Sequence, residues 1–199
     1  NTGHIVLTYA SDIHIKDCKF YDGRSFNPDN LSDIYITNCN DIIMDFNKFV
    51  SSKNAITTGY CNRIFILNNY FYDVLTYAYY DASLDNNFNI VMLGNSFNYG
   101  YGMYVIGQGN GRIIANNTAT NIRNFVTLNN ARFVTVSNNS VTALSTANHI
   151  VDVVNSEHNI INGNQFYSGR GITLTAGSNR NLITNNQCRS GYWGIIIAG

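Results

Sequence analysis

The chain has 199 residues, of which 45% are hydrophobic and only 12% carry a charge, and its 12 basic and 12 acidic residues give a net charge of zero. This apolar content can bury the core of a single domain and excludes an intrinsically disordered chain. No basic stripe with interleaved aromatic residues suits a nucleic-acid partner, and no apolar run is long enough to cross a membrane.

Asparagine recurs at one position of seven successive repeats. Four of the six spacings between these residues are 22 positions, and the other two are 26 and 25. The residues are Asn47, Asn69, Asn95, Asn117, Asn139, Asn164 and Asn186. Repeats of this length are typical of a solenoid, in which each unit buries its apolar face only by stacking on its neighbours.

Within each repeat, apolar and polar residues alternate with period two in short segments. In chain order these include Ile34-Tyr35-Ile36, Ile64-Phe65-Ile66, Val126-Thr127-Leu128 and Val134-Thr135-Val136. Such alternation predicts strands with one buried face, and the repeat reads as two short strands with few residues left for a helix.

Equivalent positions carry similar side chains, which predicts that they stack in columns. Two positions after the asparagine, five of eight repeats have phenylalanine, at Phe20, Phe49, Phe71, Phe97 and Phe166. If the rungs stack in register at ~4.8 Å, each buried asparagine is expected to hydrogen-bond its amide to the next asparagine and to the turn backbone.

The repeat resembles that of a known fold family. Units such as Gly171-Ile172-Thr173-Leu174, followed by Asn181-Leu182-Ile183-Thr184-Asn185-Asn186, are similar to the generic repeat of the pectate-lyase-like superfamily, and the resemblance covers nearly the whole chain. It implies an all-β, single-stranded, right-handed parallel β-helix of about eight rungs with a 22-residue period. The competing fold is a leucine-rich repeat, because Ile64-x-Ile66-x-x-Asn69-x-Phe71 also fits that pattern. The second β-patterned segment of each unit favours the β-helix.

We expect residues 1–199 to form a single β-helix domain. Solenoids need polar caps over their terminal rungs, and none is visible in residues 2–7 or 194–199. The sequence is therefore interpreted as an excerpt of a longer chain, or as a chain whose ends are covered by a partner subunit.

The four cysteines, Cys18, Cys39, Cys61 and Cys188, do not form a metal site, because they lack close pairs or histidines at ligand spacing. Cys39 and Cys61 occupy a column of mostly small residues on adjacent rungs. They are interpreted as small buried hydrophobes, and a disulfide between them stays open.

A column of charged residues provides the leading catalytic candidates. It begins with Asp12, Asp41 and Arg63, and alternation puts it on the outer face with one rung, or ~5 Å, between neighbours. Two carboxylates so close push their pKa values apart, which supplies the acid and the base of a glycosidase. Asp45 is a reserve candidate, and Arg63 a substrate-binding one. The alternative is a solvated charge ladder in which Arg63 and Lys16 neutralise their neighbours.

Longer repeats indicate inserted loops around residues 21–31, 74–87 and 142–148. Binding residues concentrate on loops held by a rigid scaffold, and the first two loops lie in the acidic half of the chain.

The second insertion contains further candidates. Asp81 and Asp85 form another acidic pair, held in reserve as catalytic residues although simple solvation is the plainer interpretation. Tyr77, Tyr79 and Tyr80 lie in the segment richest in tyrosine and are candidates for stacking on sugar rings. Plain packing or contacts between subunits are alternative roles for these rings.

The C-terminal half offers little by comparison. Asp152 and Glu157 are its only acids, and their distance along the stack separates them from Asp12. His149 is isolated in sequence and is interpreted as structural.

Proteins of the superfamily commonly bind or act on polysaccharides, and the chain looks most like its bacteriophage tailspikes, given many asparagines and tyrosines and few charges. The resemblance implies a depolymerase that hydrolyses glycosidic bonds of a surface glycan. It further implies a virion-tail or extracellular location, a homotrimer, no membrane partner and no cofactor. One alternative is a non-catalytic shaft or adhesin. Another is a uronate lyase or epimerase, which would need calcium and has only Arg63 in its support.

Overall fold

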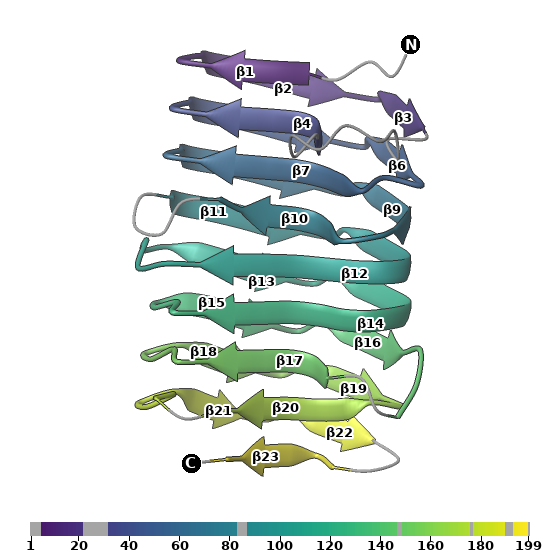
Figure 1. Ribbon diagram of the computed structural model, residues 1–199, viewed down its shortest axis with the longest axis vertical. Helices are drawn as coiled ribbons and strands as arrows, with labels where there is room; N and C mark the ends of the chain where they lie inside the picture. The colour runs from purple at the N-terminus through teal and green to yellow at the C-terminus, as the bar shows by residue number, and fades with distance from the viewer. Residues whose placement is uncertain are drawn as a thin grey trace.

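The computed structural model describes residues 5–21, 32–82, 87–146, 149–175, 177–189 and 193–198. Every regular element within these ranges is a β-strand, and the strands wind into the right-handed parallel β-helix seen in Figure 1. The predicted fold class is confirmed, and the leucine-rich repeat is excluded because its helices are missing from the described ranges. Accordingly, no helix capable of spanning a membrane occurs among these residues.

Each rung contributes strands to three faces. The front sheet, along the front of Figure 1, is built from β1 (Ile5–Thr8), β4 (Ser32–Thr37), β7 (Asn54–Gly59), β10 (Tyr77–Asp81), β12 (Ser96–Ile106), β14 (Thr118–Asn129), β17 (His149–Val154), β20 (Arg170–Leu174) and β23 (Ile195–Ile197). The back sheet is built from β2 (Ser11–Lys16), β5 (Asn40–Asp45), β8 (Asn62–Leu67), β11 (Phe88–Leu93), β13 (Arg112–Ala115), β15 (Val134–Ser137), β18 (Ile160–Asn162) and β21 (Leu182–Thr184).

A third, side sheet is built from β3 (Lys19–Tyr21), β6 (Lys48–Val50), β9 (Tyr70–Val74), β16 (Ser140–Ala143), β19 (Gln165–Tyr167) and β22 (Gln187–Arg189). The long strands β12 and β14 bend from the side sheet into the front sheet. The prediction of two strands per repeat is therefore wrong. The third strand is often only three residues long, too short for its alternation to stand out in the sequence.

The asparagine column forms the predicted ladder. Asn69 donates its backbone N–H and its Nδ2 to Asn95 Oδ1, at 2.8 and 3.1 Å, and the same Nδ2 donates to the Met44 carbonyl at 2.9 Å. Asn95 repeats this pattern with Asn117 and Ile66. Each of these buried amides thus hydrogen-bonds both to the backbone of the preceding rung and to the asparagine of the next rung.

Inside the ladder, the phenylalanine column stacks as predicted. The rings of Phe20, Phe49, Phe71 and Phe97 lie 4.8, 4.9 and 4.9 Å apart and nearly parallel. These distances match the spacing of parallel strands, which shows that equivalent residues of successive rungs are in register.

Front strands depart from strict alternation near their start. Two consecutive residues, Phe125 and Val126, are both fully buried, and β12 shifts register between Gly100 and Tyr101. As a result, residues three positions apart share the outer face of the front sheet, as the stacked rings of Tyr77 and Tyr80 show.

Replacing Asn95 tests the ladder. Asn95→Ala removes the partner of the Asn69 amides and the donor to the Ile66 carbonyl, and each buried polar group left unsatisfied costs ~1–3 kcal/mol. We expect a loss of about 3 kcal/mol in the free energy of unfolding, measured by urea denaturation. Asn98→Ala, on the outer side of β12, is the matched control and should change it by less than about 0.5 kcal/mol. Equal losses in the two variants would contradict a ladder that holds the rungs together.

Candidate functional site

The predicted column of charged residues exists. The register of β2, β5 and β8 places Asp12 beside Asp41 and Asp41 beside Arg63, on three consecutive rungs. All three have left-handed backbone conformations, with φ of 58, 56 and 56°, at the corner that leads into the back sheet. They line or border a shallow hollow that Asp12 and Asp41 share with Phe65.

The chemistry of this column is dominated by an ion pair. Arg63 donates from Nε to Asp41 Oδ1 and from Nη2 to Asp41 Oδ2, both at 2.5 Å. These hydrogen bonds hold the pKa of the Asp41 carboxyl below its ordinary value of 3.8, although both side chains are well exposed. The hydrogen bond to Asp41 raises the pKa of Arg63, and the charges of Asp41 and Asp12 act in the same direction. The geometry is that of the charge ladder, in which Arg63 favours the ionised form of Asp41.

The other predicted acids are dispersed. Asp45 is half-buried at the end of β5, next to Lys16 of the preceding rung, and accepts a hydrogen bond from Asn68 Nδ2 at 3.3 Å. Asp85 lies outside the described residues. Asp45 lies on the back sheet and is not brought to the tyrosines that sequence reasoning selected, which lie on β10 of the front sheet.

Asp81 is not a solvated acid, and this expectation is corrected. The segment interpreted as an inserted loop contains β10, whose last residue points inward. Asp81 Oδ2 there meets Arg112 Nη1 at 3.0 Å, with side chains 0% and 3% exposed, and Asn87 Nδ2 donates to Asp81 Oδ1. Arg112 also donates to the Gly109 carbonyl at 2.9 Å. Burial lowers the pKa of Arg112, and the Asp81 carboxylate acts in the opposite direction.

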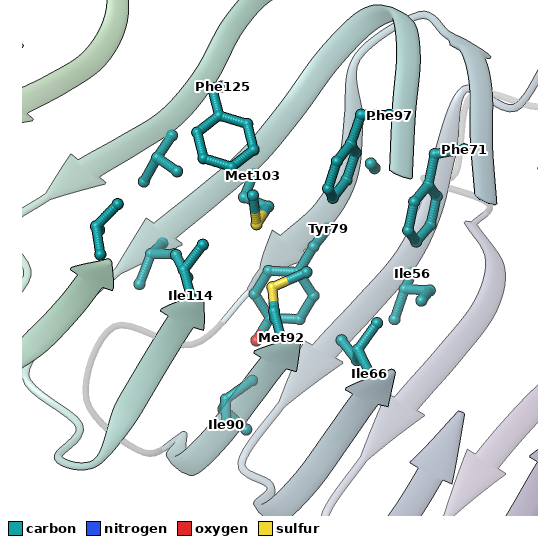
Figure 2. Close-up of a cluster of buried hydrophobic side chains, with 14 of the residues drawn as sticks. Ile56, Ile66, Phe71, Tyr79, Ile90, Met92, Phe97, Met103, Ile114 and Phe125 are labelled. Atoms are coloured by element: carbon teal, nitrogen blue, oxygen red, sulfur yellow. The ribbon is translucent and has the colours of Figure 1, made fainter. Parts of the chain in front are cut away.

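The expectation that Tyr79 stacks on a sugar ring is also corrected. It is 1% exposed and lies among Ile56, Met92 and Met103 in the core, as Figure 2 shows. Its hydroxyl is within 2.7 Å of Thr58 Oγ1, and burial raises its pKa well above 10. A ring in this position cannot stack on a sugar, because alternation along β10 sends Tyr79 inward and Tyr80 outward.

The remaining tyrosines do gather on the outer face of the front sheet. Tyr77 packs against Tyr80 with ring centroids 5.6 Å apart and against Tyr104 at 5.0 Å, and Tyr80 lies 5.6 Å from Tyr104. Burial raises the pKa of Tyr77, as do Tyr104, Tyr80 and Tyr101. We call Tyr77, Tyr80 and Tyr104 the tyrosine cluster.

A cleft of about 350 Å³ opens beside this cluster. Its walls are Tyr35, Lys53, Asn54, Thr57, Thr76, Tyr77, Tyr80 and Ala82. The register of β4, β7 and β10 aligns Tyr35, Thr57 and Tyr80 as one outward column. Asn54 Oδ1 is buried there without a hydrogen-bond partner. The cleft thus combines flat aromatic walls with an ammonium, hydroxyls and an amide.

Sequence reasoning missed the polar half of this cleft. Lys53, Asn54 and Thr57 belong to no motif, and only the column that joins Tyr35 to Tyr80 could have signalled them. The cleft and the hollow at Asp41 have no lining residue in common, so the structure does not bring the predicted carboxylates to the predicted aromatic platform.

Within the described ranges, no three histidine, cysteine or acidic side chains converge as metal ligands. The four cysteines are free thiols, and Cys39 and Cys61 are buried as small side chains in their corner. Burial raises the pKa of the Cys61 thiol.

Comparison with known proteins identifies a family and several similar structures. The family model described as a right handed beta helix region matches residues 1–141. The search of curated proteins finds no match.

DFA-IIIase from Arthrobacter chlorophenolicus A6, solved without its lid, is similar with a TM-score of 0.67 and 14% identity, over 99% of this chain and 62% of that one. Alginate lyase from Paenibacillus sp. str. FPU-7 is similar with a TM-score of 0.52 and 11% identity, over 84% of this chain and 75% of that one. At such identities the likeness concerns the fold, and this chain spans less than two thirds of the DFA-IIIase chain.

Replacing Arg112 tests the buried ion pair. Arg112→Met strips the interior Asp81 carboxylate of its cation, which should cost about 3–5 kcal/mol in the free energy of unfolding. The double variant Arg112→Met with Asp81→Val should be more stable than Arg112→Met alone, because no charge is then left in the core. Urea denaturation of the two single variants and the double variant measures the coupling. Strictly additive losses would contradict the pairing.

Proposed function

The chain belongs to the family of right-handed β-helix regions, and from this premise we propose that it binds a polysaccharide on the outer face of its front sheet and processes it. The tyrosine cluster and the cleft beside it are the observation that carries the proposal. Aromatic rings offer a flat apolar surface with a polar tip, which suits the faces of sugar rings, while the hydroxyls and amide of the cleft suit sugar hydroxyls. A DFA-IIIase and an alginate lyase with the same fold support the choice of a carbohydrate as the ligand.

The finer proposal is a tailspike-like depolymerase of a surface glycan, at a virion tail or outside the cell, working as a homotrimer and without a cofactor. Asp41 is the candidate base of this reaction, in a hollow separate from the tyrosine cleft, because Arg63 favours its ionised form. Asp12, one rung away, is the neighbouring carboxylate that a two-carboxylate mechanism needs. The uronate lyase or epimerase has less support, because Arg63 already donates from Nε and Nη2 to Asp41.

A non-catalytic shaft or adhesin is the second candidate function. It is favoured by a mostly apolar column on the outer face of the back sheet, formed by Ile43, Phe65, Val91, Ile113, Ile160 and Leu182 and interrupted by Thr135 between Ile113 and Ile160. A second copy of this chain, with the same straight column, is the occupant such a stripe fits. In that case the stripe, and not the tyrosine cluster, joins the subunits.

Removing one ring tests glycan binding. Tyr80→Ala should weaken the affinity for alginate or fructan oligosaccharides about tenfold, or ~1.4 kcal/mol, because the platform loses its central ring. Calorimetric titration of the purified protein measures the affinity. Tyr9→Ala, an 82% exposed tyrosine at a turn, is the matched control and should bind like the parent.

Equal affinities for Tyr80→Ala and the parent would contradict this placement of the glycan. If no oligosaccharide binds and light scattering gives a multiple of the monomer mass, the shaft is the function supported.

Cleavage of a polysaccharide substrate tests Asp41 as the proposed base. Asp41→Asn should abolish cleavage of a substrate polysaccharide. Because Arg63 lowers the pKa of Asp41, Arg63→Gln should raise that pKa and move the acidic limb of the pH–rate profile to higher pH. Reducing-end assays across the pH range measure both effects. Unchanged turnover in Asp41→Asn would remove Asp41 from the mechanism.

A further inference from the structure

Four polar residues form a second group on the outer face of the front sheet, nearer the C-terminus. The register of β17 and β20 places His149 beside Arg170 and Asp152 beside Thr173. His149 and Asp152 are three positions apart on one strand, the same offset that brings Tyr77 and Tyr80 together. We call these four residues the polar quartet.

The contacts within the quartet orient its side chains. Arg170 Nη1 lies 2.9 Å from His149 Nε2, and His149 Nδ1 lies 3.7 Å from Asp152 Oδ1. A guanidinium can only donate, so His149 Nε2 is the acceptor side of the first contact. Nδ1 faces Asp152 but is too far away for a hydrogen bond. The carboxylate therefore keeps its acceptor capacity.

Unsatisfied polar atoms concentrate here. In the described part of the chain, four side-chain atoms are buried without a hydrogen-bond partner: Asn54 Oδ1, Asp152 Oδ1, Arg170 Nε and Thr173 Oγ1. Three of the four belong to the quartet, and the fourth lies in the tyrosine cleft. Thr173 is only 4% exposed. Buried groups are normally paired, so such a concentration marks a place where stability is given up for another purpose.

The next rung adds an aromatic platform. Ile172 pairs with Ile195, and Gly171 N donates to the Trp193 carbonyl at 3.0 Å, which puts Trp193 beside Arg170 in the same column. Trp193 is the only tryptophan of the chain and is 54% exposed.

The two ends of the face are joined by polar residues on β14. Asn124 and Thr127, which hydrogen-bond to each other at 3.3 Å, occupy the same two columns on the rung between the tyrosine cluster and the quartet. From Tyr80 on β10 to Trp193 beside β23 there are five strand steps, a span of ~24 Å.

We propose that the polar quartet and Trp193 form a second carbohydrate subsite, so that one glycan chain lies along the front sheet parallel to the solenoid axis. This inference rests on the proposed function and extends it. The Trp193 ring stacks on a sugar, the Asp152 carboxylate accepts hydrogen bonds from its hydroxyls, and Arg170 donates to its oxygens. His149 holds Arg170 in place and is a positioning residue. Only an oligosaccharide long enough to span ~24 Å engages both ends.

Trp193 itself provides the test, because a single tryptophan reports only its own subsite. The probes are alginate and fructan oligosaccharides from disaccharides to about decasaccharides, titrated while the tryptophan emission is recorded. We expect long oligosaccharides to shift or quench the emission, with at least tenfold higher affinity than disaccharides of the same sugar. Asp152→Asn should weaken this response at least fivefold. Glu157→Gln, which neutralises the other acid of this half at a different corner, is the matched control and should leave it unchanged.

The outcomes separate this inference from the proposed function. If calorimetry shows binding that depends on Tyr80 while Trp193 emission stays constant and Asp152→Asn binds normally, the second subsite is overturned and the tyrosine site stands. If Trp193 responds and Asp152→Asn weakens the response while Tyr80→Ala does not, the subsite stands and the tyrosine site fails. If no probe changes the emission or releases heat, both are overturned.

Discussion

The structure depends on in-register stacking of a buried amide. Asn95, for example, accepts a hydrogen bond from the backbone N–H of Asn69 and donates hydrogen bonds to the Ile66 carbonyl and to Asn117 Oδ1. One side chain thus satisfies backbone groups of the corner that would otherwise be costly to bury. A shift of register would break these hydrogen bonds at every rung and separate the stacked rings of Phe49 and Phe71. Because the interior fixes the register, equivalent outer residues must also lie one above another. The surface of the protein is consequently a set of columns.

The interior departs from its apolar pattern at a buried ion pair. Asp81 shares a column with Val105 and Leu128, and Arg112 shares one with Ile90 and Val134. Placing two charges in such columns costs several kcal/mol of desolvation, which only their mutual contact and hydrogen bonds to backbone carbonyls offset. The ion pair crosses the interior next to the insertion and links β10 of the front sheet to β13 of the back sheet. The neighbouring Tyr79 hydroxyl finds its partner in the same polar pocket.

The features that follow from the regular repeat spacing were predicted correctly from the sequence, and the predictions failed where a rung departs from that spacing. The ladder, the phenylalanine stack and the placing of Asp12 beside Asp41 all follow from spacing. Tyr79 was misplaced because the extra length of its repeat suggested a loop, whereas the segment is a strand with an inward side chain. The charge-ladder alternative anticipated that Arg63 neutralises a neighbouring acid, but not its two hydrogen bonds to Asp41, since register brings backbones together and rotamers decide which atoms meet.

The polar quartet shows the reverse case, in which residues isolated in sequence are assembled by the fold. His149 and Arg170 are 21 positions apart, with no motif to link them, yet they are lateral neighbours on adjacent rungs. Period-two alternation along β17 would have sent His149 and Asp152 to opposite faces. Because Ile150 and Val151 both point into the core, His149 and Asp152 lie on the same outer face. In a solenoid of this kind a site is thus formed by residues at equivalent positions of successive rungs, and not by residues close together in the sequence. Substitutions on one rung can therefore change what a surface binds while the asparagine ladder preserves the fold.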